Sequence, residues 1–279
     1  MSRGVGISWR SLVRMSTNVI IFAVRLLLAP TLIGLVSLAG KRWGATVSGW
    51  LVGLPLTSGP VSLLLALEYG TTFASNAAQG TTIGLISLAV FCLVYSWLSL
   101  YMGWLSCLML SWTAYLFSTA LLSFVILPLV FTFVIVAASL TIGVMLMPKS
   151  KHVVVMTQSW YWDTPLRMLI AAIFVLVLTG LAGILGPHLS GLLAPFPLFA
   201  TILAVFTHRL HGALTTCRLL RGVMIGSFTF GVFFLIVGST IARWGTAPAF
   251  ALAILVTLFV HTSSLLLLRF FEPAHRSTN

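Results

Sequence analysis

Long apolar runs, separated by short polar segments or by glycine and proline, constrain this chain more than any other feature. Of its 279 residues, 59% are hydrophobic and only 6% are charged. A helix needs about 20 consecutive apolar residues to cross the hydrocarbon core of a bilayer, and several of the runs reach that length. We therefore expect an all-α integral membrane protein.

The ends of these runs predict about nine transmembrane helices. The predicted helices are residues 18–40, 48–69, 80–98, two spans within 99–147 that turn near Ser118, 166–185, 189–206, 222–241 and 248–271. The segments 71–79 and 208–221 then become loops between helices.

An internal repeat relates the two halves of the chain. Residues 44–93 align without a gap onto residues 186–235, so that Gly186 stands 142 positions after Gly44. Two related membrane units in one chain are typical of transporters. The other matched pairs are Ser48 and Ser190, Gly49 and Gly191, Leu51 and Leu193, Pro55 and Pro197, Leu56 and Leu198, Gly70 and Gly212, Gly80 and Gly222, Ile83 and Ile225, Gly84 and Gly226, Phe91 and Phe233, and Leu93 and Leu235.

The repeat divides the chain into a first unit, 1–120, a linking helix with a basic loop, 121–165, and a second unit, 166–279. We expect four helices in each unit. The second unit then begins after an odd number of crossings, so the two units face opposite sides of the membrane as an inverted repeat.

The distribution of basic residues partly supports this topology. Segment 71–79 has no Lys or Arg, whereas its repeat partner 208–221 contains Arg209, Arg218 and Arg221. Cytoplasmic segments carry an excess of Lys and Arg, so the second segment is predicted to be cytoplasmic. The same topology leaves the basic N-terminal residues, 3 to 14, on the outer side, against the rule.

The formal charge of +12 indicates contact with anionic lipid headgroups rather than with nucleic acid. The bases lie between apolar spans, and no basic aromatic stripe or nucleic-acid-binding motif is present. We therefore expect membrane lipids as partners.

The candidate substrate-binding residues lie in two matched segments that proline and glycine interrupt. Proline removes a backbone donor and breaks a helix, and backbone groups freed within the bilayer must face protein or a water-lined cavity. The start of the helix after each break offers free N–H groups to an anion. A simple packing kink is the alternative explanation for each break. The candidates are Pro55, Thr57, Ser58, Gly59 and Pro60 in the first segment and Pro195 and Pro197 in the second.

Four further ionisable residues are candidates near the predicted spans. Arg25 and Arg167 match across the repeat and are predicted to attract an anionic substrate, or to anchor the helices at the interface. Glu68 and His261 are candidate coupling sites for a proton or cation, because ionisable groups at depth are commonly functional. For Glu68 a headgroup position at a helix end is the alternative, and for His261 a packed helix interface.

The sequence carries no enzyme motif. It has three acidic residues in all and lacks the HExxH, GxSxG and glycine-rich phosphate-binding patterns. The three cysteines have no metal-binding spacing. We predict a protein that is not an enzyme and that needs no metal or cofactor.

Residues 189–237 resemble the small bacterial inner-membrane proteins of the GlpM type. The resemblance rests on the run from Leu189 to Ala200, LSGLLAPFPLFA, and on the segment from Leu219 to Phe228, LLRGVMIGSF. It implies a tandem duplication of a four-helix unit, placed in the bacterial inner membrane. It also implies a link to the machinery that makes envelope polysaccharide.

Together these features predict a multi-pass inner-membrane transporter. Its substrate is a small anionic or lipid-linked molecule, which would bind where the two broken helices meet. The alternative is a non-transporting membrane subunit that supports envelope polysaccharide or lipid assembly. Either protein could act as a homo-oligomer.

Overall fold

In the computed structural model, every described element is an α-helix. The structure describes residues 31–55, 58–125, 127–148, 165–166, 168–170, 172–173 and 196–271. Within these residues, five helices are long and apolar enough to cross a membrane. The fold is therefore that of an α-helical membrane protein. The nine predicted spans are not all within the described residues.

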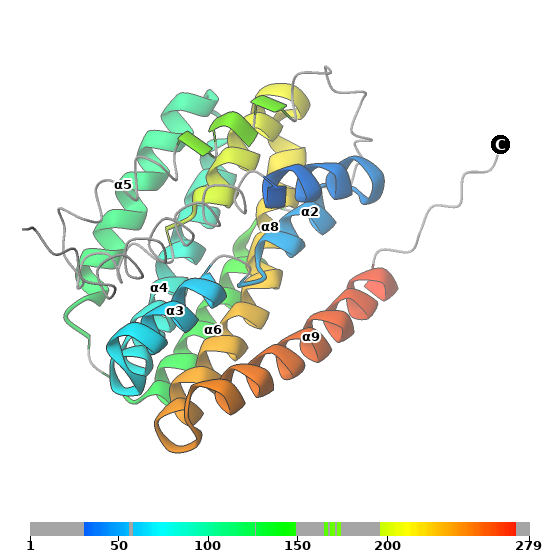
Figure 1. Cartoon of the computed structure of the whole chain (residues 1–279). Helices are drawn as coiled ribbons and strands as arrows, with labels where there is room; N and C mark the ends of the chain where they lie inside the picture. Colours follow the sequence, from blue (N-terminus) through cyan, green and yellow to red (C-terminus); the bar gives the residue numbers. More distant parts are fainter. Residues whose placement is uncertain are drawn as a thin grey trace, which may run out of the picture.

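The long helices of the bundle are α4 (Thr71–Leu98), α5 (Trp104–Leu122), α6 (Leu129–Leu146), α8 (Leu198–Trp244) and α9 (Thr246–Phe271). In Figure 1, α5 and α9 lie on opposite sides of the bundle, with α4, α6 and α8 between them. Large apolar side chains on α5, α6 and α9 are exposed, among them Phe117, Phe131 and Phe259. These faces are suited to contact with lipid chains.

Helix α8 is two helices joined at Gly212. This glycine has φ 79° and ψ 177°, a conformation that only glycine adopts at little cost. We call the two parts α8a (198–211) and α8b (213–244). Gly70 has nearly the same conformation, φ 88° and ψ 170°, and separates α3 (Ser58–Tyr69) from α4.

The predicted helix 48–69 is two helices, α2 (Ala45–Val52) and α3, and the described residues between them, 53–55, are not helical. The residues that contact each other increase in number together along the α2 and α3 segment and along α8b. Gly49 lies against Leu219, Gly53 against Gly226 and Gly59 against Phe233. Together α2 and α3 therefore run parallel to α8b as one interrupted helix, and the interruption lies near the middle of α8b.

Paired glycines bring α2 close to α8b. A Cβ atom on Gly49 or Gly53 would overlap the backbone of α8b, and one on Gly222 or Gly226 would overlap the backbone of α2. Each helix thus presents two small residues four positions apart, the spacing that lets membrane helices cross in close contact. This crossing fixes the position of the helix end that leads into the break.

Three sequence predictions about helix boundaries are wrong. Segment 71–79 is helical, and segment 208–221 is helical except for the kink at Gly212, so neither is a loop. The turn expected near Ser118 lies after α5, between Leu122 and Leu129. Polar residues in the first segment are satisfied between helices, since Ser75 donates to the Gly238 carbonyl (2.8 Å) and Gln79 donates to that of Leu127. The segment could therefore be helical although it is not apolar.

Candidate functional site

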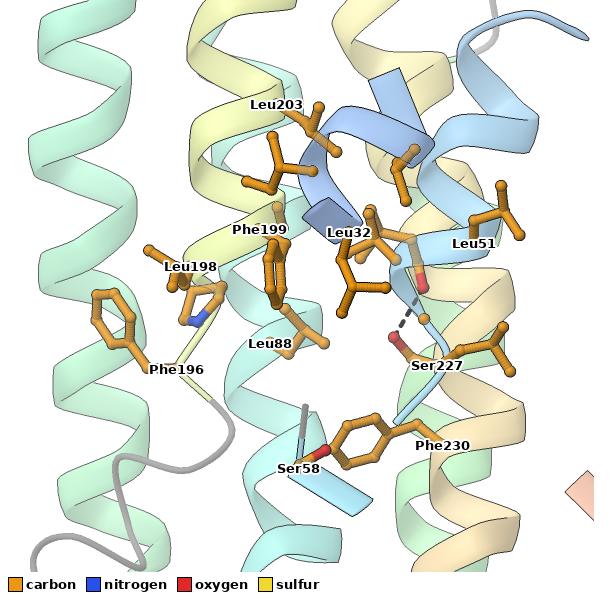
Figure 2. A pocket seen from close by; sticks show the side chains of 18 of the residues that line it. Leu32, Leu51, Ser58, Leu88, Phe196, Leu198, Phe199, Leu203, Ser227 and Phe230 are labelled. Carbon is orange, nitrogen blue, oxygen red and sulfur yellow. Dashed lines mark hydrogen bonds between the residues drawn. The ribbon is translucent and has the colours of Figure 1, made fainter. Parts of the chain in front are cut away.

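A cavity of about 70 Å³ lies where the two interrupted segments meet. Gly53, Leu54 and Ser58 line it from the first segment, and Phe196, Pro197 and Leu198 line it from the second. Figure 2 shows the labelled side chains arranged around this space, from several helices that are distant in sequence. The break between α2 and α3 and the start of α8 therefore border the same space. The other lining residues are Leu32, Ile33, Val36, Leu51, Val52, Leu85, Leu88, Phe199, Ala200, Leu203, Val223, Ser227 and Phe230.

The two half-helices that follow the breaks begin at this cavity and run to opposite ends of the bundle. Helix α3 begins at Ser58, and its Ala66 packs with Ile241 and Ala249 where α8b ends and α9 begins. Helix α8a begins at Leu198, and its His208 packs edge-on against Tyr95 near the end of α4. Both N-termini, the positive ends of the helix dipoles, therefore face the cavity.

Polar groups at the cavity are few. The Ser58 hydroxyl is buried and has no hydrogen-bond partner among the described residues. The Ser227 hydroxyl donates to the Val223 carbonyl within its own helix (2.7 Å). At the start of α8a, Leu198 N–H donates to Phe196 O and Thr201 N–H donates to Pro197 O, both at 2.7 Å. At the start of α3, Gly59 N–H donates to Pro55 O (2.9 Å) and Pro60 has no N–H. The remaining N–H groups of each first turn have no acceptor within the helix, so they can bind a ligand.

The rest of the lining is apolar, and none of the described lining residues is charged. A bare ion would be poorly solvated in such a cavity, because apolar side chains cannot replace its water. A molecule with one compact anionic group and an apolar body is a better match for this surface. The anionic group would lie at the helix N-termini and the apolar body against the leucine and phenylalanine side chains.

The two segments differ in chemistry although they match in position. Ser58 of the first segment aligns with Ala200 of the second, and both line the cavity. Pro55 and Pro197 are both buried, as is Gly59. At this aligned position, the first segment therefore brings a hydroxyl to the cavity and the second brings a methyl group.

Some of the predicted site residues lie outside the described residues. Pro60 and Glu68 belong to α3, with Glu68 next to its last residue, but the surroundings of their side chains are not described. Those that lie wholly outside are Arg25, Thr57, Arg167 and Pro195.

His261 lies in α9 and is not among the residues that line the cavity. Its side chain is buried, with 5% of its surface exposed, and it stacks on Trp50 of α2. Neither Trp50 nor the cavity residues of α4 and α8b were predicted from the sequence. Ser227 and Phe230 follow the matched Gly226, so the repeat alignment was the one signal that pointed toward them.

Basic side chains gather at one end of the bundle. Lys41, Arg42 and Arg209 are exposed there, and Arg209 lies over the Trp104 ring, 5.3 Å from its centre. Arg218 and Arg221 are half-buried near the start of α8b. At the opposite end, where α8b meets α9, Arg243 is the only Lys or Arg among the described residues.

Comparison with known proteins gives no match: no family model, no curated protein and no solved structure resembles the chain significantly.

Proposed function

We propose that the protein is a membrane transporter that carries an anionic, largely apolar molecule, such as a lipid-linked phosphate, between the two broken helices. The observation that carries the proposal is the shared cavity, which both interruptions line and toward which two half-helices point their N-termini. Discontinuous helices that meet near the membrane centre are a recurrent form of transporter binding site.

An inverted repeat of two units supports this function and is part of the proposal. Ser75 Oγ donates to Gly238 O (2.8 Å), and Cys217 Sγ donates to Ser96 O (3.4 Å). The two contacts are equivalent under the repeat alignment. Cys217 aligns with Ser75, and Gly238 aligns with Ser96. The kinks at Gly70 and Gly212 are related in the same way. A duplicated GlpM-type unit would account for both correspondences.

The orientation in the membrane follows from the charge at the two ends. We propose that the end with Lys41, Arg42, Arg209, Arg218 and Arg221 faces the cytoplasm of a bacterial cell, because cytoplasmic ends are enriched in Lys and Arg. Exposed bases at that end would also attract anionic headgroups, which raises the local concentration of an anionic lipid substrate.

The test is transport in proteoliposomes that contain the full chain. A fluorescent alkyl phosphate is the main probe, with inorganic phosphate and the corresponding uncharged alcohol as comparisons. The native protein should accelerate movement of the alkyl phosphate far more than that of either comparison. Pro55→Ala combined with Pro197→Ala should lower that rate by about tenfold or more, because restored helices would close the cavity.

Pro128→Ala combined with Pro248→Ala is the matched control. These prolines are exposed and do not line the cavity, so their removal should leave transport unchanged. Equal rates in the native protein and the Pro55 and Pro197 variant would remove the assigned site. No acceleration by the native protein over empty vesicles would contradict transport of this substrate class.

A further inference from the structure

A histidine and a tryptophan from different units stack beside the broken helix. The rings of Trp50 on α2 and His261 on α9 lie nearly parallel, with their centres 3.5 Å apart and an interplanar angle of 11°. His261 Nδ1 also lies 3.2 Å from Thr229 Oγ1 on α8b. All three side chains are buried, at 5%, 5% and 1% exposure. Three helices thus meet at one imidazole.

The imidazole lies level with the middle of α8b, since Thr229 is close to the midpoint of residues 213–244. Neither α2 nor the segment 222–242 of α8b contains a titratable residue. On α9, Arg269 is eight residues beyond His261, about 12 Å along the helix. Ala66 of α3 belongs to the same buried cluster as Phe250 of α9, which precedes His261 by eleven residues, about 16 Å along the helix. Glu68 follows Ala66 by two residues, so its backbone lies toward the start of α9.

The stack is directly linked to the proposed transport site. The residues after Trp50, from Leu51 to Leu54, line the cavity. The backbone of Trp50 is held against Gly222 and Gly226 by the close helix crossing. A change in the Trp50 and His261 contact would therefore act on the end of α2 that enters the break.

We propose that His261 is a proton-binding site, and that the proton it takes up crosses the membrane together with the anionic substrate. The inference rests on the proposed function. One proton on the imidazole changes its charge from zero to +1, and an anionic group of charge −1 in the nearby cavity balances it. Two opposite charges in the bilayer interior are far less costly than either one alone.

Trp50 gives the protonated state a favourable surface. The face of an indole ring attracts a cation, so an imidazolium can remain stacked where water is scarce. Thr229 Oγ1 can accept a hydrogen bond from a protonated ring nitrogen. Trp50 and Thr229 thus hold the histidine in either charge state, and the substrate anion decides which state is more stable.

A fluorescence titration tests the proton site without any transport. An imidazolium quenches a stacked indole, so the emission of Trp50 should fall as the pH is lowered. The emission of Trp50 is obtained by subtracting the fluorescence of the corresponding Trp50→Phe variant from the fluorescence of each protein. The fall should occur in the native protein and in His211→Gln, which removes a histidine near the basic end, and should vanish in His261→Gln. An equal fall in His261→Gln overturns the proposal.

Thr229→Val is a second variant for the same titration, since it keeps both rings and nearly the same volume. It removes an acceptor for the charged imidazole, so the midpoint of the fluorescence change should move to lower pH by about one unit. An unchanged midpoint overturns the assignment of the proton to this imidazole. The titration of Thr229→Val keeps the proton site testable if His261→Gln fails to fold.

Transport measurements separate this inference from the proposed function. If one proton accompanies each anion, the native rate should depend on pH by up to about tenfold per unit in the limiting range, and His261→Gln should lose that dependence. Alkyl phosphate transport with the same pH profile in both proteins would refute the coupling alone. A pH-dependent Trp50 signal without any transport would refute the proposed function and leave the proton site standing.

Discussion

The two proline-containing segments that line the cavity differ in how they are held and in what they bring to it. The first packs closely against α8b through Gly49 and Gly53, contains Trp50, which stacks on His261, and brings the Ser58 hydroxyl to the cavity. The second brings Phe196, Phe199 and Ala200 to the same space. The comparison teaches that helix ends at matching sequence positions can line one cavity, whereas single side chains set the chemistry of its surface.

The largest expected effect concerns the glycine crossing in the first segment. Gly226→Ala places a Cβ atom into the backbone of α2, so the helices must separate. Overpacking of this kind should lower the free energy of unfolding by roughly 3 kcal/mol, seen as a reduced thermal or denaturant midpoint in detergent.

Gly103→Ala is the control for this substitution. Gly103 has φ −69°, and a Cβ atom added to it would meet no neighbouring atom within 4 Å, so alanine should be tolerated there. Equal stability of the two alanine variants would mean that α2 does not lie against α8b as described.

The paired kinks should respond alike and somewhat less strongly. Gly70→Ala and Gly212→Ala each force a Cβ atom onto a backbone with positive φ, at a cost of about 1–3 kcal/mol per site. Unfolding measurements should give similar losses for the two variants. A large loss at one site and none at the other would break the proposed structural equivalence of the units.

Substitutions of Ser58 and Ala200 test the chemical difference between the two segments. Ser58→Ala should weaken binding of the alkyl phosphate about fivefold, the effect of losing one hydrogen bond of about 1 kcal/mol. Ala200→Ser adds a hydroxyl at the aligned position and should not weaken binding. Titration of the probe by its fluorescence measures both. Unchanged affinity in Ser58→Ala would exclude its hydroxyl as a ligand.

The smallest expected effect lies in the two hydrogen bonds that the proposed repeat relates. Ser75→Ala removes an O–H donor, and Cys217→Ala removes a weaker S–H donor. The stability loss should be about 1 kcal/mol for Ser75→Ala and less for Cys217→Ala. Denaturant titration can resolve this order. A larger loss at Cys217 would show that the thiol has another structural role.

The sequence predicted the features that depend on one helix at a time. Apolar length indicated a helical membrane protein, Pro55 lies in the break between α2 and α3, and Pro197 directly precedes the start of α8, because proline acts on its own backbone. It did not predict the helical state of residues 71–79, since Ser75 and Gln79 find their partners on other parts of the chain. The turn after α5 was misplaced because the apolar run continues through it without a charge.

The contents of the cavity depend on contacts between distant segments and were less predictable. The glycine pairs at 49 and 53 and at 222 and 226 are visible in the sequence, but their mutual crossing is not. The stack of Trp50 on His261 joins residues more than 200 positions apart. Both contacts follow from the arrangement of helices, which no local pattern encodes.

Access to Ser58 from water is the most direct test of the central claim that a substrate passes between the two breaks. In a chain with Cys92, Cys107 and Cys217 replaced by alanine, Ser58→Cys should react with a small water-soluble maleimide during turnover, and the alkyl phosphate should slow the reaction. Ser111→Cys, which is buried on α5 away from the cavity, is the control and should stay unreactive. If Ser58→Cys is as unreactive as the control, or reacts at the same rate with and without the probe, the cavity is not on a transport path.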